Sequence, residues 1–166
     1  MYQIALCDDK TEELDKIENM LGSYRQQHAG CDFLMERFSS ADELLFRVKE
    51  KKYVPDVLFI DIYMPGKLGI EAAKELRNMG NECHIVFLTI SKEYALEAFG
   101  VEAAQYLIKP VSCEEIFRIL DRLIKEMKEK EKEKQYLLLK VEGIIKRIAL
   151  NNIIYCEAQK NSSVSI

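Results

Sequence analysis

Short hydrophobic runs recur along residues 2–108, separated by stretches in which the apolar positions lie three or four residues apart. Brief apolar runs bounded by polar residues are typical of buried strands, and the wider spacing is typical of amphipathic helices. Strands are therefore predicted at residues 2–7, 33–38, 57–61, 85–88 and 104–108. Because the two patterns alternate, we expect strands and helices to alternate as well.

Helices are predicted after each of the five strands. The first has the apolar stripe Leu14, Ile17, Leu21 and Tyr24, and the second and fifth begin at capping boxes over residues 40–43 and 112–115. The third covers residues 70–79, and the fourth contains Tyr94, Ala95, Ala98 and Phe99, with Gly100 as its expected C-terminal cap. Right-handed crossovers then favour an α/β fold with a doubly wound, five-stranded parallel sheet of flavodoxin-like order 2-1-3-4-5.

The pattern changes after residue 125. Residues 126–135 are a highly charged helix end or linker, in which Lys and Glu alternate from Lys128 to Lys134. Residues 136–166 consist of short β-like runs at 136–141, 144–150, 153–156 and 164–166. So few strand residues do not bury a core of their own. We therefore expect a short β-rich C-terminal fragment of a second, truncated domain.

Composition narrows the function classes. The net charge of -4 argues against an electrostatic DNA or membrane binder as a whole. The chain has no apolar stretch of membrane-spanning length and no signal-peptide pattern, so we expect a cytoplasmic protein without membrane association. Its five cysteines are odd in number and lack C-x-x-C spacing, which indicates reduced thiols packed as small hydrophobic side chains.

The ends of four predicted strands carry residues capable of chemistry. Asp8 and Asp9 follow the first strand, Asp61 ends the third, Thr89 follows the fourth and Lys109 follows the fifth. The carboxyl ends of parallel strands lie at one sheet edge, where open α/β folds bind ligands. Three carboxylates there suit Mg²⁺, which offsets their repulsion. Asp61 is the candidate nucleophile toward phosphorus, with Thr89 and Lys109 receiving the phosphoryl oxygens.

Each residue taken singly also has a plain structural interpretation. An aspartate at a strand end often caps a helix, a threonine closes a turn, and a lysine before proline is solvated. Their convergence on one edge is what favours a site.

At these positions the chain resembles the receiver domain of bacterial two-component response regulators. The matching residues are Asp8-Asp9, Asp61 with Met64-Pro65 and Gly69, Thr89, and Tyr106 ahead of Lys109-Pro110. The resemblance covers residues 1–125. It implies that a sensor histidine kinase phosphorylates Asp61, with Mg²⁺ held by Asp8, Asp9, Asp61 and the Tyr63 backbone carbonyl.

The same resemblance implies how the signal spreads. Thr89 would turn toward the phosphate and Tyr106 would pack inward behind it. The face formed by the fourth helix, fifth strand and fifth helix would change, and it often forms a homodimer. The Lys109–Pro110 peptide bond is usually cis in this family.

Residues 93–99 and 148–157 resemble regulators whose output is a LytTR-type DNA-binding domain. This resemblance implies that residues 136–166 begin such a domain, so that DNA is a partner of the full protein and the output is transcription control.

Two positions are expected to modulate access to the site. Ile90 is bulky and β-branched where receivers usually have a small residue, and Tyr63 lies two residues after Asp61. Two alternative functions remain open. A Mg²⁺-dependent phosphohydrolase with an aspartate nucleophile would need a second acid where Tyr63 stands. A receiver-like binding module that is never phosphorylated would not need the full acidic set. The favoured interpretation is a regulator, not an enzyme.

Overall fold

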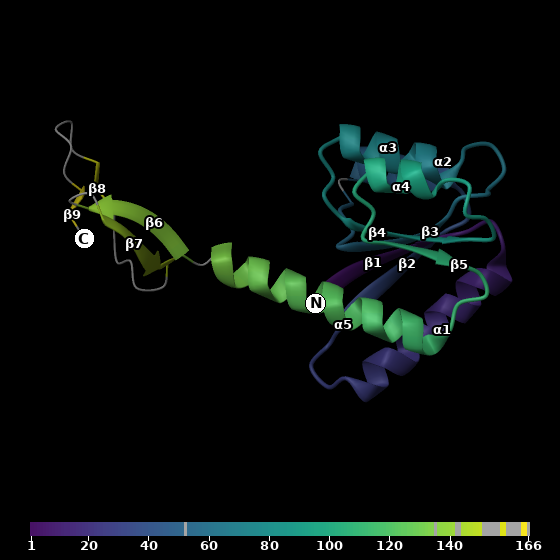
Figure 1. The fold of residues 1–166 in the computed structure, drawn as a ribbon, viewed down its shortest axis with the longest axis horizontal. Helices are drawn as coiled ribbons and strands as arrows, with labels where there is room; N and C mark the ends of the chain where they lie inside the picture. Colours follow the sequence, from purple (N-terminus) through teal and green to yellow (C-terminus); the bar gives the residue numbers. More distant parts are fainter. Residues whose placement is uncertain (52, 135, 142–143, 151–156, 159–163, 166) are drawn as a thin grey trace. The chain divides into compact units, whose positions relative to one another are not determined.

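The computed structural model describes residues 1–51, 53–134, 136–141, 144–150, 157–158 and 164–165 (Figure 1). The elements of the first part are β1 (Tyr2–Cys7), α1 (Thr11–Gln27), β2 (Phe33–Phe38), α2 (Ala41–Lys51), β3 (Val57–Asp61), α3 (Gly69–Asn78), β4 (His84–Thr89), α4 (Ala95–Gly100), β5 (Gln105–Ile108) and α5 (Cys113–Lys134). The predicted alternation of strands and helices is therefore correct, with small differences at the ends.

The five strands form one parallel sheet of order β2-β1-β3-β4-β5, as predicted. Register places Cys7 beside Ile60 and Asp61 beside Leu88, and Thr89 lies beside Ile108. The carboxyl ends of all five strands therefore lie along one edge of the sheet. Asp8, the residue after β1, is level with Asp61, the last residue of β3.

Helices cover both faces of the sheet, with α2, α3 and α4 on one side and α1 and the start of α5 on the other (Figure 1). Leu58 and Ile60 of β3 belong to a core cluster that includes residues of α2 and α3. The alternate residue Phe59 lies beside Leu14 and Ile17 of α1. Strands covered on both faces read as continuous apolar runs, which explains the sequence pattern.

The two predicted capping boxes form differently. At α5 the box is reciprocal: the Glu115 N–H donates to Ser112 Oγ (3.3 Å) and the Ser112 N–H donates to Glu115 Oε2 (2.9 Å). At α2 the Glu43 N–H donates to Ser40 Oγ (3.2 Å), but the Glu43 carboxylate accepts the N–H of Ser39 (2.8 Å). Both arrangements satisfy backbone donors that a helix start otherwise leaves without partners.

Arg77 links two backbone segments at the end of the sheet opposite the carboxyl ends. Its guanidinium donates to the carbonyl oxygens of Val101 (2.9 Å), Asn81 (2.7 Å) and Cys83 (2.9 Å). These carbonyls belong to the residue after α4 and to the loop that leads into β4. One side chain of α3 therefore fixes the C-terminal end of α4.

The expected glycine cap of α4 is wrong. Gly100 is the last residue of the helix, and its φ is not positive. The left-handed residue is Glu102, with φ of 51°. The turn into β5 therefore uses a non-glycine residue in a conformation that costs most side chains free energy.

The chain divides into two compact units, Met1–Ile119 and Leu120–Ile166. In the second unit, β6 (Tyr136–Val141) and β7 (Ile144–Ala149) form an antiparallel hairpin, and β8 (Glu157–Ala158) pairs with β9 (Val164–Ser165). The predicted strand at 153–156 lies outside the described residues. Residues 128–132 are exposed, in keeping with their charge.

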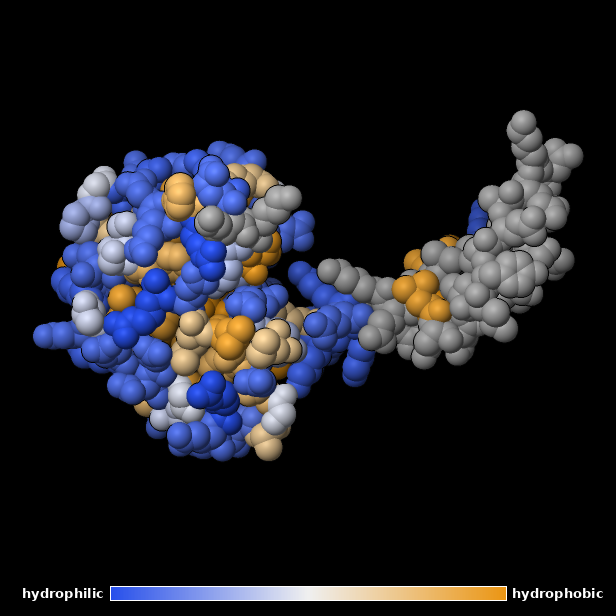
Figure 2. Space-filling model, turned by 180° about the vertical axis from the view of Figure 1, so that it is seen from behind, coloured by the Kyte–Doolittle hydropathy of each residue, from blue (hydrophilic) through white to orange (hydrophobic). Residues whose placement is uncertain are grey.

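Hydrophilic side chains cover most of the first unit's face seen in Figure 2, with limited apolar patches. Cys7 and Cys83 are buried, whereas Cys113 is exposed, so not every thiol packs as a small hydrophobic side chain. Among the residues that the structure describes, no helix is long and apolar enough to cross a membrane.

Candidate functional site

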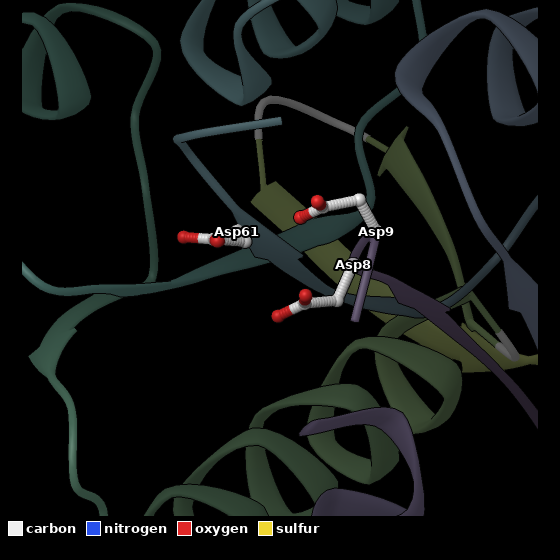
Figure 3. A group of neighbouring side chains, drawn as sticks. All are labelled: Asp8, Asp9 and Asp61. Carbon is white, nitrogen blue, oxygen red and sulfur yellow. The ribbon is translucent and has the colours of Figure 1, made fainter. Parts of the chain in front are cut away.

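Three carboxylates meet at the carboxyl edge of the two central strands. Asp8 and Asp9 follow β1, and Asp61 is the last residue of β3. Asp8 and Asp61 are only 5% and 4% exposed, and Asp9 is half-buried. Carboxylate oxygens of the three lie within 4.8 Å of one another. Figure 3 shows the three carboxyl groups projecting to the same side of the strand ends.

Lys109 brings a largely buried ammonium to this cluster from the end of β5. Its backbone N–H donates to the Thr89 carbonyl (2.7 Å), so the side chain starts beside β4. From there Nζ lies 2.6 Å from Asp8 Oδ2 and 3.4 Å from Asp61 Oδ2. The side chain therefore spans the strand ends and partly neutralises two of the three carboxylates.

The pKa values reflect this crowding. Burial raises the pKa of Asp61 above its usual value; Lys109 opposes the rise, and the charge of Asp8 adds to it. Burial alone would lower the pKa of Lys109, but the hydrogen bond to Asp8 and the neighbouring negative charges outweigh it and raise that pKa. Lys109 therefore stays charged near neutral pH.

The two oxygens of Asp61 have different surroundings. Oδ1 accepts the backbone N–H of Ile62 at 2.8 Å, whereas Oδ2 faces Lys109. Asp8 is held on both sides, because its Oδ1 accepts the N–H of Lys10 at 2.9 Å and its Oδ2 accepts Lys109. Oδ2 of Asp61 is the better placed of its oxygens to react with an incoming group.

Two buried oxygens at this edge have no hydrogen-bond partner within the described ranges. They are Asp9 Oδ1 and the hydroxyl of Thr89, whose residue is fully buried. Unsatisfied buried polar atoms are rare in folded proteins and call for an explanation. A cation beside Asp9 and an oxygen-rich ligand beside Thr89 would satisfy both.

The carboxylate cluster fits Mg²⁺. Ligands on opposite sides of this ion stand about 4.2 Å apart, since each lies 2.0–2.1 Å from the metal. The observed spread of up to 4.8 Å needs only small side-chain adjustments. Asp8, Asp9 and Asp61 are the side chains that would hold the ion. The proposed contribution of the Tyr63 carbonyl stays a prediction.

The loop after β3 leaves almost no room at Gly69. Its N–H donates to the Ile62 carbonyl at 2.9 Å. A Cβ atom built on this glycine would lie 2.0 Å from the backbone oxygen of Asp61, which is too close for any side chain. The glycine therefore lets the start of α3 pack directly against the backbone that carries Asp61.

Aromatic residues connect the loops around the site. The Tyr63 hydroxyl donates to Glu93 Oε2 at 2.7 Å, and the ring packs edge-on against Tyr94, with centroids 5.8 Å apart. The Tyr106 hydroxyl donates to the Ser91 carbonyl at 2.6 Å. Tyr106 is half-buried and also lies beside Phe87. The segment between β4 and α4 is thus held by two tyrosine side chains, a contact that the sequence pattern did not indicate.

Two further residues lie near Lys109. Ile90 is 69% exposed and lines a surface pocket of about 290 Å³ together with Lys109 and Pro110. Glu13 of α1 lines the same pocket, and its Oε2 lies 3.8 Å from Lys109 Nζ. Glu13 lies in the first turn of α1, and the pattern of apolar positions does not point to it as a site residue. The Lys109–Pro110 peptide bond is cis.

Comparisons with known proteins agree with this geometry. The family model "Response regulator receiver domain" matches residues 4–121. A sensory transduction protein LytT of Oceanobacillus iheyensis is 41% identical over 134 residues, which are 79% of this chain and 51% of that protein. The positive alginate biosynthesis regulatory protein of Pseudomonas aeruginosa is 31% identical over 72% of this chain and 46% of its own length. The chain thus spans about half the length of these relatives.

Solved structures share the fold. Chemotaxis protein CheY4 of Vibrio cholerae aligns with a TM-score of 0.61 and 27% identity, covering 74% of this chain and 98% of that one. The response regulatory domain of protein mrkE from Klebsiella pneumoniae gives 0.64 at 24% identity, covering 76% and 98%. With the family model covering most of the chain, this protein belongs to the response regulator receiver domain family.

Proposed function

We propose that this chain is the input part of a two-component transcription regulator. A sensor histidine kinase passes a phosphoryl group to Asp61, and the resulting change controls a C-terminal DNA-binding domain. The observation that carries the proposal is the meeting of three carboxylates, the Lys109 ammonium and the unpartnered Thr89 hydroxyl at one sheet edge.

The residues have separate tasks in the transfer. Asp61 Oδ2 attacks phosphorus, the bond from phosphorus to the histidine nitrogen breaks, and the electron pair returns to the imidazole. Mg²⁺, when bound, neutralises charge on the phosphoryl oxygens. Lys109 pairs with one of those oxygens and the Thr89 hydroxyl donates to another, so both side chains gain a new partner when Asp61 is phosphorylated. Tyr106 then follows the movement around Thr89.

The proposed output is transcription control through a LytTR-type domain that begins within residues 136–166, after a charged linker at 126–135. Support comes from the β6–β7 hairpin and from relatives named as sensory transduction and alginate regulatory proteins. We propose that DNA contact belongs to that domain and that the protein works in the cytoplasm, where its kinase partner would transfer phosphate.

The direct test is labelling by a small phosphodonor such as acetyl phosphate. We expect about one equivalent of acid-stable, base-labile phosphate per chain, dependent on Mg²⁺ and lost in Asp61→Asn. Asp42→Asn, an exposed carboxylate on α2, is the matched control and should label normally. Steady release of phosphate from a generic ester, abolished by Asp61→Asn, would instead favour the phosphohydrolase, and absence of labelling would favour a binding module.

Ile90 is proposed to slow the loss of phosphate by shielding Asp61 from water. Shortening this side chain in Ile90→Ala is expected to speed decay of the phosphorylated protein by about threefold, equivalent to about 0.7 kcal/mol in the barrier. The decay of label after removal of free donor measures this effect. Leu96→Ala, at another exposed apolar position, serves as control. Equal decay of Ile90→Ala and wild type would contradict the proposal.

We propose that phosphorylation promotes a homodimer through the face formed by α4, β5 and α5. Leu96 and Phe99 on α4 are both 86% exposed, and large apolar side chains exposed to solvent favour association between proteins. Leu96→Glu is expected to weaken phosphorylation-dependent dimerisation at least tenfold, as measured by analytical ultracentrifugation. Phe46→Glu, an exposed apolar position on α2, should leave it unchanged. A dimer equally sensitive to both changes would rule out this face.

A further inference from the structure

We propose that Glu13 is a positioning residue that competes with the phosphoryl group for Lys109. This inference rests on the proposed acceptor function of Asp61. It adds a charge from α1 that the site's carboxylate cluster does not include. Glu13 would set how strongly the unphosphorylated site resists an incoming phosphodonor.

The contacts of Lys109 give the first step. Its Nζ has carboxylate oxygens at 2.6 Å from Asp8, 3.4 Å from Asp61 and 3.8 Å from Glu13. The lysine side chain is 11% exposed and Glu13 is 23% exposed, so water screens this pair only partly. Three negative charges therefore share one cation before any phosphoryl group arrives.

Two of these three carboxylates change their interactions when the site binds Mg²⁺ and accepts a phosphoryl group. Asp8 would bind the metal, and the charge of Asp61 would move to the phosphoryl oxygens. Glu13 takes part in neither step and keeps its negative charge. To pair with the phosphoryl group, Lys109 must therefore weaken its attraction to Glu13.

Glu13 also forms an ion pair with a second cation, on its own helix. Lys16 lies one helical turn further along α1, with Nζ 2.5 Å from Glu13 Oε1. The Lys16 side chain is 59% exposed. It pairs with Oε1 of Glu13, whereas Lys109 lies near Oε2. The Lys16 pair thus draws Glu13 away from Lys109, and loss of Lys16 would leave Glu13 more strongly attracted to Lys109.

The test is the dependence of Asp61 labelling on donor concentration at saturating Mg²⁺. In Glu13→Gln we expect the acetyl phosphate concentration for half-maximal rate to fall about three- to tenfold, because one repelling charge is removed. The rate at saturating donor should change less than twofold. Added salt should shrink the difference from wild type, since the pair is partly accessible to ions.

Two further variants separate positioning from general effects. Glu12→Gln removes the same charge from an exposed neighbour on the same turn and should label as wild type does. Lys16→Met should raise the half-maximal concentration, opposite in sign to Glu13→Gln. A general loss of stability would not move the two variants in opposite directions.

The outcomes distinguish this inference from the function on which it rests. If wild type labels but Glu13→Gln behaves like Glu12→Gln, the role of Glu13 is overturned and the acceptor function stands. If Glu13→Gln and Lys16→Met shift in the same direction, the competition is likewise overturned. If wild type does not label at all, both fall.

Discussion

Lys109→Ala is expected to destabilise the metal-free protein by about 3 kcal/mol, because it strands two buried carboxylates without their shared cation. Asp8 and Asp61 are 5% and 4% exposed, and Lys109 Nζ lies 2.6 and 3.4 Å from their oxygens. This loss is at the lower end for a broken buried pair because the carboxylates lie at the edge of the sheet. Urea unfolding at pH 7 in EDTA measures the loss.

Mg²⁺ should recover part of that stability, since a cation bound by the same carboxylates replaces the missing charge. Lys67→Ala is the matched control. Lys67 also pairs with two carboxylates, Asp42 and Glu75, but these are 72% and 36% exposed, so the cost should stay below about 1 kcal/mol. An equal loss with and without Mg²⁺ would show that the carboxylates do not account for the effect.

Lowering the pH should also reduce the loss of stability that Lys109→Ala causes. Burial raises the folded-state pKa of Asp61 above its ordinary value of 3.8, so folding favours the protonated carboxyl. That contribution is present below the unfolded pKa and is lost as pH rises through the raised folded pKa. Without Lys109 the folded pKa of Asp61 rises further. The difference in unfolding free energy between variant and wild type should therefore shrink from pH 7 toward pH 4.

Gly69→Ala is expected to cost at least about 3 kcal/mol, because its Cβ would lie 2.0 Å from the backbone oxygen of Asp61. Relief of that contact requires the start of α3 or the end of β3 to move. Because β3 carries Asp61, we also expect labelling by acetyl phosphate to slow by about tenfold or more, the equivalent of about 1.4 kcal/mol. Urea unfolding and the labelling rate measure the two effects separately.

Gly22→Ala provides the opposite control. Gly22 lies inside α1, its φ is not positive, and, apart from its chain neighbours and the backbone of its own helix, a Cβ there would have no described atom within 4 Å. Alanine should stabilise the protein by about 0.5–1 kcal/mol through its better helix propensity. If Gly69→Ala were tolerated as well as Gly22→Ala, the close packing of α3 on β3 would not hold in solution.

Much of the fold could be predicted because the central strands β1, β3 and β4 are buried along most of their length. The continuous apolar run before Asp61 indicates such a strand directly, and parallel pairing then places Asp8 and Thr89 at the same edge. The first-helix stripe ending at Tyr24 is equally direct, since all four of its members are buried. Local pattern and tertiary burial agree in these elements.

Other contacts depend on loop conformation, which periodicity does not describe. The Tyr63–Glu93 bond joins two loops, and its partners are 30 residues apart in sequence. The approach of Glu13 to Lys109 depends on how α1 packs beside the end of β5. The left-handed Glu102 replaced the expected role of Gly100, because a glycine marks flexibility without fixing which residue turns.

The bonds of Arg77 determine how α4 can move. The carbonyl of Val101, directly after this helix, accepts a hydrogen bond from the guanidinium that also binds Asn81 and Cys83. The segment before the helix is held instead through the side chains of Tyr63 and Tyr106. The residue after α4 is thus anchored by a hydrogen bond to its backbone carbonyl, whereas the segment before α4 is held by two tyrosine hydroxyls and by the packing of Tyr63 on Tyr94. A displacement of α4 would therefore be a pivot about its C-terminal end, with the largest movement at the end that follows β4, on the edge of the sheet that carries the carboxylate cluster.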